Sequence, residues 1–165
     1  EVQPKVRVMT DSVARRSSLD EERTWLQIRY GRGLWAGRDS ALIAHEVLAP
    51  LAAPGVDWGA PLIDLRGERP GWREWSQKNG QQNLPPSKIS FDSMEHAISA
   101  ARRGMGVVLG SVPLASADLR EGRLRRLDLP ELHTKDGYWL TWPEGRAKSK
   151  KQRALIEDFL KALRG

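Results

Sequence analysis

The sequence predicts an α/β fold, because extended and helical patterns alternate along the chain. The clearest segment, ISFDSMEHAISAARRGMGVVLG at 89–110, has the pattern of a strand, a helix, a glycine turn and a second strand. Met94, Ala97, Ile98 and Ala101 follow the spacing of one helix face. The apolar run after the glycines is typical of a buried parallel strand, so this segment is predicted to be a βαβ unit with a right-handed crossover.

The segments before this unit favour two strands and a long extended run. Residues 5–9 alternate as a strand does, and a short helix is expected at 19–23. Residues 26–30 predict a second strand that ends at a pair of glycines. The extended run at 41–53 is expected to be broken by Pro50 and Pro54, because proline is unfavourable inside a central strand. We therefore expect a segment that crosses between two lobes.

The next elements alternate again. A strand is expected at 61–65, a short helix at 71–80 and a loop at 81–87. Trp72 and Trp75 fall on one side of that helix, which predicts that both pack into the core.

The C-terminal part continues the alternation. A short helix is expected at 115–121, and strands are expected at 124–127 and 138–142. The last helix, at 151–163, has apolar residues on one face and charged residues on the other, so it should pack on the sheet along one side.

The composition is that of a folded globular protein. The chain has 165 residues, of which 39% are hydrophobic and 29% charged. The absence of cysteine excludes disulfides and thiolate metal sites and is compatible with a reducing compartment. No apolar run approaches the roughly 20 residues of a membrane span, and the N-terminus has no signal-peptide core. A cytoplasmic location without membrane contact is the expectation.

The chain is basic, with a net charge of +6 and a pI near 10.0, which raises the question of nucleic-acid binding. Its arginines and lysines are spread over several short clusters, such as those at 120–126 and 146–153. The sequence contains neither a helix-turn-helix motif nor zinc-finger spacing. Solvated helix faces and loops are therefore favoured over a DNA-contacting surface.

Motifs for catalysis, metal binding or cofactor binding are not evident. His45, His96 and His133 lie far apart and lack metal-site spacing, so we expect surface or partly buried histidines, no metal and no cofactor. The serines lack a nucleophile-elbow motif, although a triad assembled from distant positions stays open. The glycine pairs at 31–33 and 104–106 are too short for a dinucleotide fingerprint and fit turns better.

The order of motifs along the chain resembles a known family. Two motifs precede the βαβ unit and three follow it: WLQIRYGRGLW at 25–35, HEVLAPLAAP at 45–54, VPLA at 112–115, DLREGRL at 118–124 and GYWLTWP at 137–143. Together they resemble the effector-binding domain of LysR-type transcriptional regulators, in particular the subfamily of the glycine-cleavage activator and the β-lactamase regulator. Gln27 departs from the pattern, because the family commonly has an apolar or small residue there.

The resemblance implies a type 2 periplasmic-binding-protein-like fold. Such a domain has two Rossmann-like lobes, joined by two crossing segments, with an effector cleft between them. Lobe I should comprise residues 1–50 and 128–165, and lobe II residues 51–127.

The resemblance also implies an incomplete lobe I, because the family's sensing domain opens with a strand and a helix that precede the segment matching residues 2–8. That strand lies centrally in lobe I, between the strands matching residues 5–9 and 26–30. We expect another chain to complete lobe I, or the two remaining strands to pair directly, or the region of residues 1–25 to be loosely ordered. Lobe II should be intact.

The resemblance also points to candidate effector-binding residues, which are Ser93, Tyr138, Arg32, Trp35, Asp92 and Met94. Each has a simpler structural alternative. Asp92 and Ser93 are good helix N-caps, worth about 1 kcal/mol, although a helix N-terminus can also hold an effector carboxylate. Tyr138 either faces the cleft or packs on the sheet, and Met94 either borders the cleft or lies in the core. An arginine near the loop at 31–35 either pairs with an anionic effector or is exposed.

These patterns predict the effector-sensing domain of a LysR-type regulator, and not an enzyme. A small metabolite would bind between the lobes and change the lobe or dimer arrangement, which would act on DNA through an N-terminal domain absent from this chain. A homodimer or homotetramer is the expected assembly. The alternative is a solute-binding protein of a transport system, which would share the fold and carry an export signal in its full-length gene. An upstream winged helix-turn-helix would instead indicate the regulator.

Overall fold

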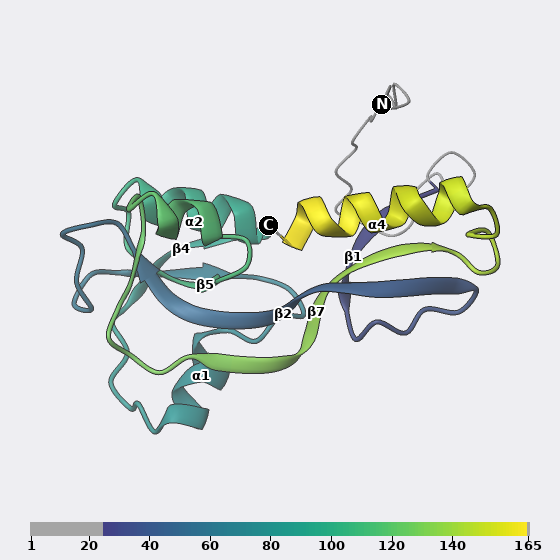
Figure 1. The fold of residues 1–165 in the computed structure, drawn as a ribbon. Coiled ribbons are helices and arrows are strands. Elements are labelled where there is room, and N and C mark those ends of the chain that lie inside the picture. The colour runs from purple at the N-terminus through teal and green to yellow at the C-terminus, as the bar shows by residue number, and fades with distance from the viewer. Residues whose placement is uncertain (1–24, 165) are drawn as a thin grey trace.

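The computed structural model describes residues 25–164, and within them one mixed sheet runs through the whole molecule (Figure 1). The strands are β1 (Gln27–Gly31), β2 (Arg38–Ala52), β3 (Leu62–Leu65), β4 (Ser87–Phe91), β5 (Val107–Ser111), β6 (Arg125–Arg126) and β7 (Leu132–Pro143). The helices are α1 (Trp72–Asn79), α2 (Met94–Arg102), α3 (Ser116–Arg120) and α4 (Lys150–Arg164). The strand order is β1-β7-β2-β5-β3-β4, and β6 pairs with β2. The strand expected at 5–9 and the helix expected at 19–23 lie outside the described residues.

One half of the sheet is parallel and confirms the predicted βαβ unit. Strand β3 pairs in parallel with β4 on one side and with β5 on the other. The chain moves outward through α1 to β4 and then returns through α2, over β3, to β5. Both crossovers are expected to be right-handed, but they run across the sheet in opposite directions. The helices α1 and α2 must therefore cover opposite faces of the sheet, as Figure 1 shows.

The hydrophobic core fills this half of the molecule. The α2 residues Met94, Ala97, Ile98 and Ala101 are all buried, as their spacing predicted. On the opposite face, Trp72 and Trp75 of α1 are buried and meet edge to face, with their ring centroids 5.5 Å apart. Their indole N–H groups donate to main-chain carbonyls, at 3.0 Å for Trp72 and 2.7 Å for Trp75, so the buried rings leave no polar atom unsatisfied.

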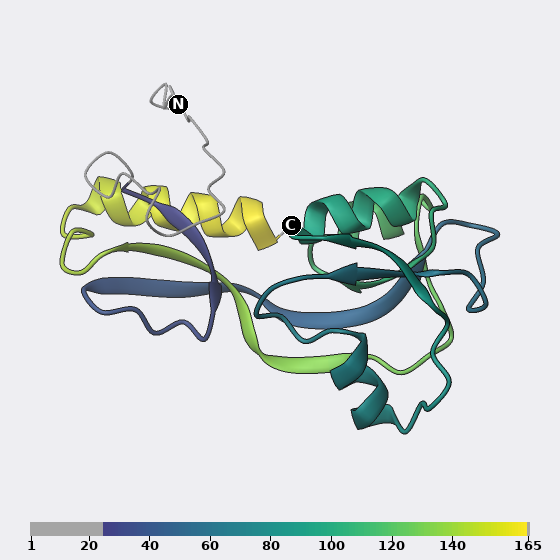
Figure 2. The same ribbon diagram turned by 180° about the vertical axis from the view of Figure 1, so that it is seen from behind.

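The other half of the sheet is antiparallel and depends on two long strands. Strand β2 pairs with β7 from the Arg38–Pro143 pair to the Leu48–Leu132 pair, and its distal end then pairs with β5. Both strands run from one half of the molecule into the other, which Figure 2 shows from behind. They are the two crossing segments predicted from the resemblance. Helix α4 lies over the β1–β7 end, on the same side of the sheet as α2.

Pro50 does not interrupt β2, contrary to the expectation of a run broken at this residue. It lies opposite Leu109 of β5, and its carbonyl accepts a hydrogen bond from the Leu127 N–H at 2.9 Å. The nitrogen of a strand residue points to the same neighbour as its carbonyl, so the missing N–H of Pro50 faces the end of the two-residue strand β6. The missing N–H therefore costs few hydrogen bonds between strands, and β2 continues through Pro50.

The prediction of an incomplete lobe I stays a prediction. Within the described residues β1 pairs with β7 and with no second strand. Residues 1–24 lie outside the described part of the chain, so the prediction is not tested.

Candidate functional site

The carboxyl ends of β3, β4 and β5 meet at one edge of the parallel half. Arg69 lies in the loop after β3, Asp92 and Ser93 follow β4, and Ser111 ends β5. Ser111 pairs with Leu48 of β2, so this edge faces the antiparallel half of the sheet. Open α/β sheets bind ligands at the carboxyl ends of strands where the chain order reverses, and β3, flanked by β4 and β5, is that point.

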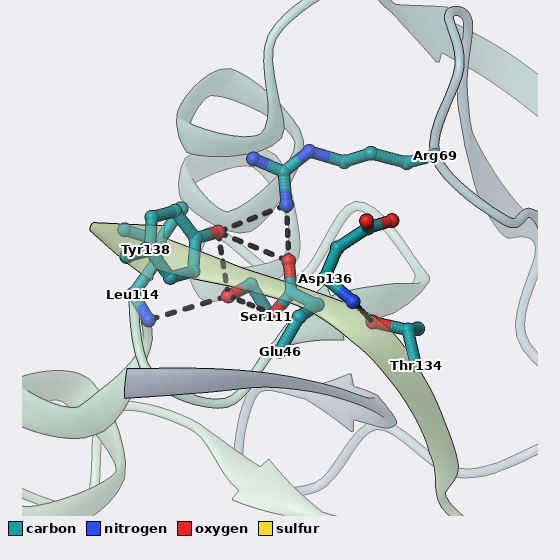
Figure 3. Close-up of polar contacts among 7 residues, drawn as sticks. All are labelled: Glu46, Arg69, Ser111, Leu114, Thr134, Asp136 and Tyr138. Carbon is teal, nitrogen blue, oxygen red and sulfur yellow. Dashed lines mark hydrogen bonds and ion pairs between the residues drawn. The ribbon is translucent and has the colours of Figure 1, made fainter. Parts of the chain in front are cut away.

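Four side chains form a buried polar group at this edge, which we call the Glu46 cluster: Glu46, Arg69, Ser111 and Tyr138 (Figure 3). Glu46 is 0% exposed. Its carboxylate accepts hydrogen bonds from the Ser111 hydroxyl at 2.7 Å and the Tyr138 hydroxyl at 3.0 Å, and it forms an ion pair with Arg69 Nη1. The same Nη1 donates to the Tyr138 oxygen at 2.9 Å. Several donors thus converge on one buried carboxylate.

The cluster changes the proton affinity of its members. Burial raises the pKa of Glu46 above its ordinary value, although the hydrogen bond from Ser111, the charge of Arg69 and the hydrogen bond from Tyr138 each lower it. Burial also raises the pKa of Tyr138, and it raises the pKa of Tyr30 to about 12. Both phenols therefore stay protonated at neutral pH, and the Tyr138 hydroxyl is the one that donates a hydrogen bond to Glu46.

Arg69 links the two halves of the molecule. Its guanidinium lies over the Tyr30 ring of β1, 3.6 Å from the centroid, and 5.5 Å from the Tyr138 ring of β7. Tyr30 and Tyr138 are neighbours in the β1–β7 register, with ring centroids 5.5 Å apart. A loop of the parallel half is thereby fixed to three strands, β1, β2 and β7, by one charged side chain.

Of the predicted site residues, the structure places Tyr138 in the cluster and the residues around Ser93 apart from it. Ser93 is the N-cap residue of α2, but its side chain makes no capping hydrogen bond, so the expected side-chain cap is wrong. Asp92 is exposed, and Met94 is 6% exposed and belongs to the hydrophobic core. No hydrogen bond or ion pair among the described residues joins these three to Tyr138.

The predicted site residues in the loop after β1 lie at the surface of the molecule. The Arg32 side chain is 74% exposed and lies 4.0 Å from Asp136, which corresponds to the simpler alternative of an exposed arginine. Trp35 is half-buried, and the Arg29 guanidinium lies 5.8 Å from its ring centroid. Gly33 has φ +84, and a Cβ there would lie 2.6 Å from the Trp139 ring, so the loop conformation requires glycine.

Sequence reasoning missed Glu46, Arg69, Ser111 and Tyr30 as site residues. Glu46 carried a usable signal, because it is the only acidic residue in the stretch at 41–53, which is apolar apart from His45, and buried carboxylates require partners. Arg69 carried none, since it lies in a polar loop beside other charged residues.

Other classes of site receive no support within residues 25–164. All three histidines are exposed, as the simpler alternative predicted, and no three His, Cys, Asp or Glu side chains gather there as a metal site would require. Among these residues no helix combines the length and apolar character needed to span a membrane.

Comparison with known proteins identifies the family. Residues 3–164 match the LysR substrate binding domain. The HTH-type transcriptional activator AmpR of Rhodobacter capsulatus is 30% identical over 130 residues, which are 73% of this chain and 44% of that protein. The AhcY transcriptional activator HvrB of the same species is 31% identical over 160 residues, covering 90% and 53% respectively. The chain thus spans about half the length of these regulators.

Solved structures agree with this relationship. The effector domain of AmpR from Pseudomonas aeruginosa superimposes with a TM-score of 0.68 at 25% identity, covering 92% of this chain and 78% of that one. The AmpR effector binding domain from Citrobacter freundii gives a TM-score of 0.66 at 26% identity, covering 86% and 76%. The chain therefore belongs to the LysR substrate-binding domain family and has its type 2 periplasmic-binding-protein-like fold.

Proposed function

We propose that this domain is the effector-sensing part of a LysR-type transcriptional regulator and that it binds a small metabolite between two lobes. Family membership supports this role, and the matched relatives are transcriptional activators. The solute-binding alternative finds no support among them. The effector is bound without being chemically changed, and the full-length protein acts in the cytoplasm as a homodimer or homotetramer that contacts DNA through its N-terminal domain.

The Glu46 cluster is the observation that carries the proposal. It gathers polar groups at the carboxyl edge of the parallel strands, where this fold class binds ligands, and Arg69 spans the two halves of the molecule there. We assign residues 1–50 and 128–165 to lobe I and residues 51–127 to lobe II. The cleft between them is bordered by Arg32, Trp35, Ser93 and Tyr138, with Asp92 at its rim and Met94 beneath.

Signalling then follows from a change in the population of lobe arrangements. The effector must bind one arrangement more tightly than the other, and a shift from 1:99 to 99:1 needs a differential affinity of about 5.5 kcal/mol. The lobes are joined through β2 and β7, and the β2 register shifts between Leu42 and Ala44 and between His45 and Val47. These irregularities lie beside Glu46. Changes in the Glu46 cluster therefore act on the part of β2 where its pairing with β7 is least regular.

The test compares the full-length regulator with this domain alone. Fluorescence anisotropy measures binding of each protein to the promoter DNA next to its gene, and a transcriptional reporter measures regulation in cells. We expect the full-length protein to bind selectively and to regulate the reporter in response to a metabolite. The domain alone should bind only weakly and in a salt-sensitive way, because its basic residues are dispersed. Nanomolar, sequence-selective binding by the domain alone would contradict the proposal.

A further inference from the structure

We propose that Arg69 binds a carboxylate group of the effector through its Nε and Nη2 atoms, and hence that the effector is a carboxylate-bearing small molecule. This inference rests on the proposed function, because it specifies the ligand class of the same cleft. It assigns a ligand contact to Arg69, a residue that the sequence motifs did not single out.

The hydrogen bonds of Arg69 leave one edge of its guanidinium available. Both of its hydrogen bonds, to Glu46 and to Tyr138, use Nη1. Nε and Nη2 make no hydrogen bond to any residue in the described part of the chain, and in Figure 3 neither nitrogen carries a dashed line. The N–H groups of Nε and Nη2 point the same way and form a fork that matches the two oxygens of a carboxylate.

The surroundings hold that edge in a fixed orientation. Glu46 and Tyr138 fix one nitrogen, and the Tyr30 ring lies under the guanidinium, 3.6 Å from its central carbon. A ligand therefore meets an arginine whose rotamer freedom is already lost, so little further entropy is spent on binding. The side chain is 18% exposed, which leaves it reachable while most of its surface is withdrawn from water. Charge-assisted hydrogen bonds are strengthened in such surroundings.

The charges nearby favour a carboxylate over a phosphate. Glu46 forms an ion pair with Arg69, and Asp136 lies beside the cluster in Figure 3. The ion pair with Glu46 already offsets part of the Arg69 charge, which disfavours a doubly charged ligand. The Tyr30 hydroxyl is buried and has no hydrogen-bond partner among residues 25–164, so it is a further donor available beside Arg69.

Acetate and acetamide form a matched pair of probes, because they share size and shape and differ in charge. The ¹⁵N-labelled domain is titrated with each at constant ionic strength, and the Arg69 Nε–H resonance is assigned by its absence in Arg69→Lys. We expect a saturable shift with acetate, with a Kd of roughly 1–30 mM, and a much smaller shift with acetamide. Arg126→Gln is the control, because Arg126 is an exposed arginine that pairs with Glu131, and this variant should respond as the wild type does. Equal shifts with both probes, or no saturable shift with acetate, would overturn the inference.

The full-length regulator separates this inference from the proposed function. Arg69→Gln is compared with wild type in the reporter, after tryptophan fluorescence has shown that the variant is folded, and Arg69→Lys shows whether charge without the fork suffices. An at least tenfold higher effector concentration for half-maximal response in both variants supports the carboxylate contact. An unchanged response refutes the contact and leaves the proposed function intact. If acetate binds at Arg69 but the full-length protein regulates no promoter, the proposed function fails and the carboxylate site stands.

Discussion

Replacing Arg69 by methionine isolates the energetic role of the ion pair with Glu46. The substitution keeps an apolar stem of similar length but leaves the carboxylate, which is 0% exposed, without its counter-charge. Loss of one partner of a buried ion pair typically costs about 3–5 kcal/mol. Arg69 is 18% exposed, and Ser111 and Tyr138 still donate to Glu46, so we expect a loss of about 2–3 kcal/mol at pH 7.

The loss should depend on pH in a defined direction. Glu46 already has a pKa raised above 4.5 in the folded state, and removal of Arg69 raises it further. A raised carboxyl pKa means that the folded state binds the proton more tightly than the unfolded state does. Its contribution to stability is therefore fully present below the unfolded pKa and is lost as pH rises through the folded pKa. Each unit of added pKa shift is worth about 1.4 kcal/mol, so Arg69→Met should be markedly less destabilising at pH 5 than at pH 7.

Urea denaturation followed by tryptophan fluorescence measures these values, since the chain has seven tryptophans and Trp75 is fully buried. The variants form a cycle of wild type, Arg69→Met, Glu46→Gln and the double variant, each at pH 5 and pH 7. Removal of the unpaired charge should make the double variant at least about 1 kcal/mol more stable than Arg69→Met at pH 7. The reasoning is refuted if Arg69→Met loses the same amount at both pH values, or if the double variant gains nothing.

Three further predictions follow from local geometry. Gly33→Ala should cost about 2–3 kcal/mol in urea denaturation, because φ is +84 and the new Cβ meets the Trp139 ring at 2.6 Å. Gly37→Ala has a similar φ of +70 with open space around it, so it is the matched control and should cost only about 1 kcal/mol; equal losses would contradict the steric reasoning. Ser93→Ala removes no capping hydrogen bond, so stability should fall by less than about 0.5 kcal/mol, while effector response in the reporter weakens; an unchanged response would leave Ser93 outside the cleft. Trp75→Ala should cost about 3–5 kcal/mol, and a loss under 1 kcal/mol would mean that the core of this half is not packed as described.

Periodicity sufficed for α1 and α2 and for the buried parallel strands β3 and β5, because their burial follows the order of apolar residues. The α2 face and the paired tryptophans of α1 were predicted from spacing alone and are buried. Pro50 was misjudged, since its effect depends on which side of β2 carries a long partner strand, and that is a tertiary property. For Ser93, residue type predicted the N-cap position but could not predict whether the hydroxyl would bond to the helix.

The cluster is hard to predict for a related reason. Glu46 meets Arg69 across 23 residues, Ser111 across 65 and Tyr138 across 92, so its three partners come from three separate segments. Tyr138 was found through the family resemblance, whereas Arg69 comes from a loop whose composition is ordinary. A lone acid in an apolar strand indicates that buried partners exist, but the fold decides which residues they are.

In the proposed mechanism, Arg69 couples occupancy of the cleft to the arrangement of the two halves. Its backbone belongs to the parallel half, whereas its guanidinium bonds to Glu46 and Tyr138 on the crossing strands and stacks on Tyr30 of β1. Rotation of one half against the other must lengthen some of these contacts, and Glu46 cannot find replacement donors in water because it is fully buried. An effector carboxylate on the Nε and Nη2 edge binds best when the guanidinium is held in this orientation, so it stabilises the arrangement that keeps all three contacts. Such a difference in affinity between arrangements is what a population shift requires.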